Sequence, residues 1–293
     1  MSFVWVNGWL QPADRAGLSA LDRGFTLGDG LFETVRVYQG TPFRLDAHLE
    51  RLEEGLGRLG MLPPDEEGLP RVREGVEEVL RESDHPSGSL RISVSRGRGA
   101  PGLAPPRKPD PSVVVALAGY EPDPSWYSEG IRAVVTGGRV ASQSLTSSLK
   151  HLGYLEFVLA RQEALRRGGD DGLLLTEDGT LAEGTASNLF VVRRNALLTP
   201  PLDQGILPGV TRATVLEVAG RHGVPVKEAP LPLEVLGEAQ EAFLTSSLRE
   251  LVPVVEVDGE PVGEGRPGPM WQRLRELYRE RVGMETGAAL EED

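Results

Sequence analysis

With 293 residues, the chain is long enough for two domains of ordinary size. It contains no cysteine, which excludes disulfide scaffolds, cysteine-ligated zinc and thiol nucleophiles and favours a reducing compartment. Its net charge of −13 argues against nucleic acid as a partner, and no apolar run reaches the ~20 residues of a membrane span. Because the chain also opens directly into a strand pattern without a signal peptide, we expect a cytoplasmic protein that binds neither nucleic acid nor membrane.

The first 119 residues are predicted to form a domain of mixed strands and helices. Apolar and alternating runs predict strands over 3–6, 31–38, 89–95 and 112–118, and helical spacing predicts helices over 46–59 and 69–82. Between the last two strands, residues 96–111 are rich in glycine, proline and arginine. A loop of this length is too long for a tight hairpin and is often functional. The proline-stiffened stretch 120–126 is the predicted linker.

A second domain is predicted over 127–283. Its expected strands are 131–135, 172–176, 188–193, 242–246 and 252–257, and its expected helices are 153–167, 211–222 and 269–282. The acidic end of the chain, 284–293, is predicted to be disordered. Strands and helices mixed in both blocks indicate the α/β or α+β class.

Lysine is rare in this chain, which draws attention to each position where it occurs. Of 31 basic residues, only Lys108, Lys150 and Lys227 are lysines. A bias towards arginine in the genome explains the ratio but not the positions. Lys150 directly precedes a predicted buried helix, where a lysine is ordinarily a surface charge with a buried stem. The alternative is a desolvated amine that is able to form a Schiff base.

Three other segments contain groups with chemical potential. Glu183 stands between apolar neighbours at the expected entry to a strand, as a turn glutamate in solvent or as a buried carboxylate with a cationic partner such as a protonated pyridine nitrogen. Val210 and Thr211 open a predicted helix after Gly209, either as a plain cap or as a phosphate site built from helix amides. The third segment, Thr245 to Ser247, places three hydroxyl side chains in a row at the end of a predicted strand.

The order and context of these segments resemble the fold type IV family of pyridoxal-phosphate enzymes. This family includes branched-chain aminotransferases, D-amino acid aminotransferases and aminodeoxychorismate lyases. The resemblance extends from about Val4 to Val282. It is carried by the segments Asp22 to Phe25, Gly28 to Glu33, His48 to Leu52, Lys150 to Leu155, Glu183 to Phe190, Gly209 to Arg212 and Phe243 to Glu250.

The resemblance implies a smaller N-terminal and a larger C-terminal α/β domain with pyridoxal 5′-phosphate between them. It also implies at least a homodimer, in which the partner chain helps to close the substrate pocket. Lys150 resembles the lysine that holds the cofactor through a Schiff base, and Glu183 resembles the carboxylate on the pyridine nitrogen. The positions that match the family's phosphate ligands are Arg51, Val210, Thr211 and Ser247, with Ser246 assisting.

The sequence departs from the branched-chain pattern near the lysine. Branched-chain enzymes have a tyrosine five residues after it, whereas this chain has Leu155 there and Tyr154 one position earlier. This spacing, and the loop Ser95 to Gly99, are closer to the D-amino acid and lyase branches. The candidates for substrate contact are Phe32, Arg36, Arg98 and Tyr154. An arginine can bind a carboxylate through two hydrogen bonds, although the ordinary interpretation of Arg98 is a solvated loop charge.

The leading hypothesis is an aminotransferase that moves an amino group between an amino acid and a 2-keto acid through Lys150. The alternative is an aminodeoxychorismate lyase, which eliminates pyruvate and gives 4-aminobenzoate with the same lysine. A third class, a protein that binds the cofactor without turnover, is disfavoured because mere binding needs no base. The amino donor, the acceptor and the preference for L- or D-substrates remain open.

Overall fold

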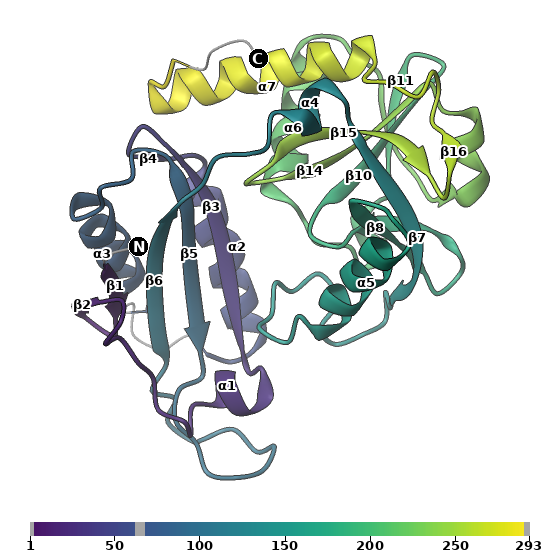
Figure 1. Ribbon diagram of the computed structural model, residues 1–293. Helices are drawn as coiled ribbons and strands as arrows, with labels where there is room; N and C mark the ends of the chain where they lie inside the picture. Colours follow the sequence, from purple (N-terminus) through teal and green to yellow (C-terminus); the bar gives the residue numbers. More distant parts are fainter. Residues whose placement is uncertain (1–2, 62–67, 290–293) are drawn as a thin grey trace. The chain divides into compact units, whose positions relative to one another are not determined.

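The structure is a computed structural model that describes residues 3–61 and 68–289. The chain folds as two compact units, each built from strands and helices (Figure 1). The first unit consists of Met1–Glu121 and Leu149–Gly153, and the second of Pro122–Ser148 and Tyr154–Asp293. The predicted α/β class is confirmed for both units.

The first unit contains a six-stranded sheet with the strand order β2-β1-β6-β5-β3-β4. Its strands are β1 (Phe3–Val6), β2 (Trp9–Pro12), β3 (Gly30–Tyr38), β4 (Thr41–Pro42), β5 (Gly88–Ser95) and β6 (Ser112–Gly119). Its helices are α1 (Arg23–Leu27), α2 (Leu45–Arg58) and α3 (Gly68–Arg81). The four predicted strands and both predicted helices are confirmed to within one residue at each end. The short elements β2, β4 and α1 were not predicted from the sequence.

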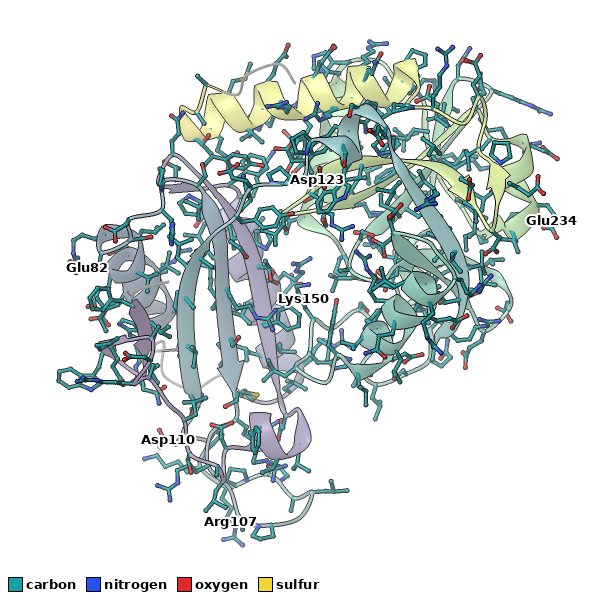
Figure 2. The ribbon with its side chains drawn as sticks, in the orientation of Figure 1. Glu82, Arg107, Asp110, Asp123, Lys150 and Glu234 are labelled. Atoms are coloured by element: carbon teal, nitrogen blue, oxygen red, sulfur yellow. The ribbon has the colours of Figure 1, made fainter. Side chains whose placement is uncertain are left out.

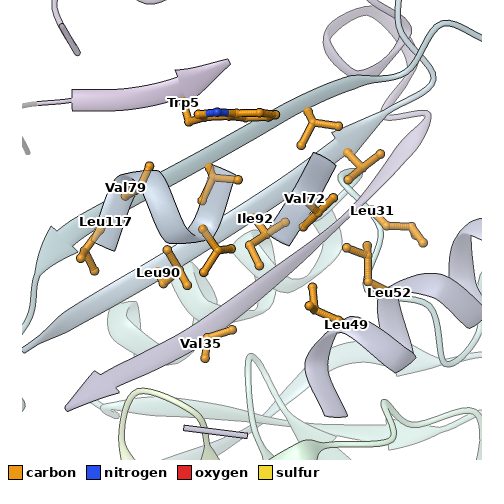
Figure 3. Close-up of a cluster of buried hydrophobic side chains, with 14 of the residues drawn as sticks. Trp5, Leu31, Val35, Leu49, Leu52, Val72, Val79, Leu90, Ile92 and Leu117 are labelled. Atoms are coloured by element: carbon orange, nitrogen blue, oxygen red, sulfur yellow. The ribbon is translucent and has the colours of Figure 1, made fainter. Parts of the chain in front are cut away.

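Helices α2 and α3 pack against one face of this sheet. Leu49 and Leu52 of α2, together with Val72 and Val79 of α3, meet Trp5 and the apolar residues of β3, β5 and β6 in one buried cluster (Figure 3). Each fully buried aliphatic side chain of this kind contributes roughly 1.5–3 kcal/mol. Because side chains alternate along a strand, the residues between these core positions point to the opposite face.

A short segment from beyond the linker is attached to the outer edge of β3. The N–H of Phe32 donates to the carbonyl of Lys150 at 2.9 Å, and the N–H of Leu152 donates to the carbonyl of Gly30 at 2.9 Å. These bonds fix the backbone of Lys150 to the first unit, whereas the sequence placed all of 127–283 in one domain. The close approach of this segment also depends on Gly28. Its φ is +69°, and a Cβ on it would lie only 3.2 Å from the backbone of Gly153, so glycine is favoured at this position.

The second unit contains a ten-stranded sheet. The strands are β7 (Ile131–Val140), β8 (Asp171–Thr176), β9 (Thr180–Gly184), β10 (Asn188–Arg193), β11 (Ala196–Thr199), β12 (Val226–Glu228), β13 (Leu231–Pro232), β14 (Glu241–Ser246), β15 (Glu250–Val257) and β16 (Glu260–Pro261). The pairing of β10 with β9 joins the run β10-β14-β15-β7-β8-β9 into a closed barrel. Four of these strands, β9, β11, β12 and β13, were not predicted, nor was β16.

In the described part of the second unit, the α-helices are α4 (Ser125–Ser128), α5 (Leu155–Arg166), α6 (Val210–Arg221) and α7 (Pro269–Thr286), and two short 3-10 helices are η1 (Leu202–Gln204) and η2 (Leu233–Glu238). The predicted helices at 153–167 and 211–222 are confirmed within two residues. The prediction of disorder from 284 onward is wrong for Met284 to Thr286, which continue α7 until Gly287 ends it in the left-handed conformation. Residues 287–289 follow the helix without regular secondary structure, and 290–293 lie outside the described residues. No helix in the described ranges has the length and apolar character of a membrane span.

Candidate functional site

Lys150 lies beside an aromatic ring that it shares with a second cation. Its Nζ is 4.5 Å from the centre of the Phe32 ring, and Cζ of Arg91 is 3.3 Å from the same centre. Figure 2 shows Lys150 next to β3, the strand that carries Phe32. Two cations on one buried aromatic ring form a local positive field that attracts an anionic group. The sequence did not identify Arg91, because only the pairing of β5 with β3 places it diagonally across from Phe32.

Arg51 is held by a buried carboxylate of β3. Its Nε donates to Oε1 of Glu33 at 2.7 Å, and its Nη2 donates to Oε2 at 2.6 Å. Nδ1 of His48 lies 2.8 Å from the same Oε2 and donates to it, since an ionised carboxylate only accepts. Glu33 and His48 are 1% and 2% exposed. The guanidinium of Arg51 is therefore locked in one orientation by two parallel bonds.

The electrostatics of this cluster decide its protonation. Burial raises the pKa of the Glu33 carboxyl, but the charge of Arg51 and the hydrogen bonds from His48 and Arg51 outweigh it and hold the pKa at about 2. Burial lowers the pKa of His48, and the charges of Arg51 and Lys150 lower it further against the opposing influence of Glu33. At neutral pH the cluster thus contains an ionised glutamate, a charged arginine and a neutral imidazole.

In the second unit, Glu183 lies in a row of polar residues across three strands. Glu183 pairs with Asn188, and Asn188 pairs with Thr245. Glu183 is 6% exposed, and its Oε2 accepts from the N–H of Leu207 at 3.1 Å. The sequence placed Glu183 at the entry to a strand; it instead stands at the end of β9, which the sequence did not predict. Of the two alternatives that the sequence left open for Glu183, a turn glutamate in solvent and a buried carboxylate, the structure shows the buried carboxylate.

The N-terminus of α6 adjoins this row. The side chain of Asn188 donates to the carbonyl of Leu207 at 2.9 Å. Its other amide atom lies so close to Gly209 that a Cβ there would overlap with it. Helix α6 begins at Val210, with Gly209 as an N-cap that has no side chain to bond the first amides, and its first turn carries no acidic residue. Such a helix N-terminus presents amide donors and a positive partial charge to an anion.

The hydroxyl segment lies next to the same row. Ser246 ends β14, Ser247 begins the turn that follows, and Thr245 precedes both. Oγ1 of Thr245 is buried without a hydrogen-bond partner among the described residues. A buried hydroxyl in this condition costs free energy unless a bound group or water satisfies it. The structure thus brings Glu183, the start of α6 and the serines together within the second unit.

The other candidates for substrate contact have different environments. Arg36 is 6% exposed, donates to the carbonyl of Tyr120 and pairs with Glu121. Arg98 is exposed and forms a bridge to Asp22 by its backbone. Tyr154 stacks on Phe157 with ring centres 4.5 Å apart. Arg36 lies over the rings of Tyr38 and Tyr120, whereas Arg91 shares the Phe32 ring with Lys150.

The long loop between β5 and β6 is anchored by the buried side chain of Arg23, the first residue of α1. This arginine, 4% exposed, donates to the carbonyls of Gly102 and Leu103 at 3.0 and 3.1 Å. Its Nε bonds Asp29 at 2.8 Å, and Arg96 bonds the same carboxylate oxygen at 2.8 Å. The backbone of the loop is thus held by hydrogen bonds to Arg23, whereas Leu103 is 84% exposed.

Comparison with known proteins decides the family. Residues 30–257 match the family described as amino-transferase class IV. The chain belongs to the class IV aminotransferases. It is 36% identical to a putative branched-chain-amino-acid aminotransferase of Methanocaldococcus jannaschii, over 94% of this chain and 95% of that protein.

Solved structures of class IV aminotransferases and their neighbours have the same fold. The branched-chain amino acid aminotransferase of Escherichia coli superposes with a TM-score of 0.90 at 29% identity, covering 99% of this chain and 97% of that one. The 4-amino-4-deoxychorismate lyase of Pseudomonas aeruginosa superposes with a TM-score of 0.82 at 35% identity, covering 95% and 99%. The resemblance to fold type IV enzymes and the two-domain fold are therefore confirmed.

Class IV aminotransferases are enzymes that use pyridoxal phosphate, and the residues of this chain suit that group. The first unit has a primary amine at Lys150 and an oriented guanidinium at Arg51. The second unit has a buried carboxylate at Glu183 and an open helix N-terminus. The buried hydroxyl of Thr245, which has no hydrogen-bond partner among the described residues, leaves a polar group there for a bound molecule. These are the chemical groups that an aldehyde, a pyridine nitrogen and a phosphate require.

Proposed function

We propose that this aminotransferase moves an amino group between an amino acid and a 2-keto acid, with Lys150 as the catalytic residue. The observation that carries the proposal is the placement of Lys150: backbone bonds to β3 fix it, and its amine lies against Phe32 beside Arg91. When bound, pyridoxal phosphate supplies an aldehyde and an electron-withdrawing ring. Lys150 Nζ would hold that aldehyde as a Schiff base. Once the amine of the substrate has displaced it, the freed amine of Lys150 would accept the proton of the substrate Cα and hold it for return.

We assign the remaining cofactor contacts by their chemistry. Glu183 keeps the pyridine nitrogen protonated, because its buried carboxylate favours a cationic partner. The phosphate is held by Arg51 and by the start of α6 at Val210 and Thr211. Ser247 donates its hydroxyl to the phosphate as well, and Ser246 assists. The buried bonds of Arg51 to Glu33 support this assignment, since they fix the orientation of the guanidinium.

We assign the substrate carboxylate to Arg91. Its guanidinium lies on the Phe32 ring that also faces Lys150, so a carboxylate held there brings the substrate Cα near the amine. Arg36 lies over the rings of Tyr38 and Tyr120 instead, and Arg98 is an exposed residue of the loop that follows β5.

We further propose a cytoplasmic homodimer. Leu155, Val158 and Leu159, spaced as one face of α5, are 67%, 45% and 54% exposed. An apolar helix face of this kind on an enzyme surface favours contact with a second copy. The exposed side chains of Phe25 and Leu103 add a second apolar surface on the first unit. The absence of cysteine supports the reducing cytoplasm.

The lyase is retained as a second candidate because the lyase structure is 35% identical over nearly the whole chain. A panel of half-reactions separates the two functions. The holoenzyme is mixed singly with L-leucine, L-glutamate, L-alanine and D-alanine, and its absorption spectrum is followed. Prompt conversion to the pyridoxamine form by any of them supports the transferase and identifies the preferred handedness. Failure with all four, together with release of pyruvate and 4-aminobenzoate from aminodeoxychorismate, supports the lyase instead.

The role of Lys150 has its own test. Lys150→Ala is expected to abolish the visible absorption band of the bound cofactor and its sensitivity to borohydride. Lys227→Ala, which removes an exposed lysine on β12, serves as the matched control and should leave both unchanged. A Lys150→Ala protein that keeps a borohydride-sensitive band would reject the assignment.

A further inference from the structure

The turn that carries Ser247 has a strained backbone. Ser246 pairs with Glu250, so Ser247, Leu248 and Arg249 alone connect β14 to β15. Glu250 closes this hairpin with φ +55°, a left-handed conformation that costs a residue with a Cβ roughly 1–2 kcal/mol. A conformation of this kind persists only where the surrounding structure fixes it.

Arg249 connects this turn to three other elements. Its N–H donates to Oγ of Ser246 at 3.4 Å, and its carbonyl accepts from the hydroxyl of Tyr127 at 3.1 Å. Its Nη1 donates to Oδ2 of Asp171 at 3.1 Å, and its Cζ lies 4.6 Å from the centre of the Trp126 ring. Backbone and side chain of one residue therefore tie the turn to α4, to β8 and to the end of β14.

Asp171 is the buried centre of these contacts. It is 1% exposed, and its Oδ1 accepts from Arg161 and from the hydroxyl of Thr185, each at 2.5 Å. Thr185 directly follows Gly184 and stands two residues after Glu183. A buried carboxylate is stable only when it is fully paired, so Asp171 and its two arginines depend on one another. One carboxylate thus links the Ser247 turn to the strand end that carries Glu183.

We propose that Arg249 is a positioning residue for the cofactor phosphate, acting through Asp171 and Trp126 to fix the turn that presents Ser247. The inference rests on the proposed function, in which Ser247 holds the phosphate. A turn fixed in advance does not have to be ordered when the phosphate binds, so the entropy cost of binding is lower. Arg249 itself does not contact the cofactor in this role.

The test compares two forms of the cofactor that differ only in the phosphate. Pyridoxal 5′-phosphate and pyridoxal are titrated into the cofactor-free full-length protein, and the ratio of the two dissociation constants is measured. Arg249→Met keeps the length and apolar stem of the side chain but removes the guanidinium. We expect it to weaken binding of pyridoxal phosphate about tenfold and to leave binding of pyridoxal unchanged, because a net hydrogen bond to a charged group corresponds to about one tenfold step in affinity.

Four further variants, Ser247→Ala among them, make the outcome decisive. Arg221→Met removes an exposed arginine of α6 and controls for the lost charge. Asp171→Asn should reproduce the effect of Arg249→Met. In a Ser247→Ala background, Arg249→Met should have little additional effect, because the contact through which it acts is already gone.

Each result separates this inference from the proposed function. If Ser247→Ala leaves the ratio unchanged, the phosphate role of Ser247 is wrong and the inference fails with it. If Ser247→Ala changes the ratio and Arg249→Met does not, only the inference is overturned. If Arg249→Met weakens both ligands equally, or acts equally in the Ser247→Ala background, Arg249 has a general structural role and the inference is likewise overturned.

Discussion

Glu33 gives the sharpest test of the electrostatics in the first unit. Its pKa is about 2 in the folded protein, against 4.5 for an ordinary glutamate. A difference of that size corresponds to roughly 3 kcal/mol of stability, at about 1.4 kcal/mol for each pKa unit. Because the folded pKa is the lower one, this stabilisation is fully present above pH 4.5 and is lost as the pH falls towards 2.

Glu33→Gln removes the charge while keeping the shape of the side chain. At pH 7 it leaves the guanidinium of Arg51 without its buried counter-charge, and breaking a buried pair in this way costs about 3–5 kcal/mol. We therefore expect the variant to be less stable at pH 7 by at least roughly 3 kcal/mol. The difference from the unmodified protein should narrow steadily below pH 4.5.

The assay is urea unfolding between pH 7 and pH 3, with hydrogen exchange of the β3 and α2 amides reporting on the first unit. Glu53→Gln, which neutralises an exposed glutamate on the same helix α2, is the matched control and should show neither effect. Equal stability of Glu33→Gln and the unmodified protein at pH 7, or a difference that does not change with pH, would refute the reasoning.

Three other predictions follow from the second unit. Glu183→Gln should keep the cofactor but lower the aminotransferase rate by about 100-fold, as checked by absorbance and steady-state kinetics; an unchanged rate rejects the role of Glu183. Gly209→Ala should displace the side chain of Asn188, lower stability by about 1–3 kcal/mol and weaken cofactor binding, as checked by thermal unfolding and titration. Leu159→Asp should dissociate the dimer in sedimentation experiments, with Met284→Asp, an exposed residue of α7, as the control; a dimer that survives Leu159→Asp argues against the α5 face.

Much of the site was predictable because it depends on local sequence. The helix that carries Arg51 follows from the spacing of its leucines, and the start of α6 follows from Gly209 ahead of an apolar helix pattern. The order of these motifs along the chain identified the family. The net charge and the absence of cysteine narrowed the possible chemistry by composition alone.

The contacts of Lys150 and Arg51 were decided only by tertiary structure. Lys150 bonds to β3, a strand far earlier in the sequence, and no local pattern encodes that pairing. Glu33 was part of a motif, but its buried bonds to Arg51 and His48 depend on how α2 packs on the sheet. Arg91 and Asp171 have ordinary sequence surroundings, and they became significant through strand register and burial. Residue types and spacing thus determined which chemistry this protein carries, whereas long-range pairing and desolvation determined which side chains meet and how they are charged.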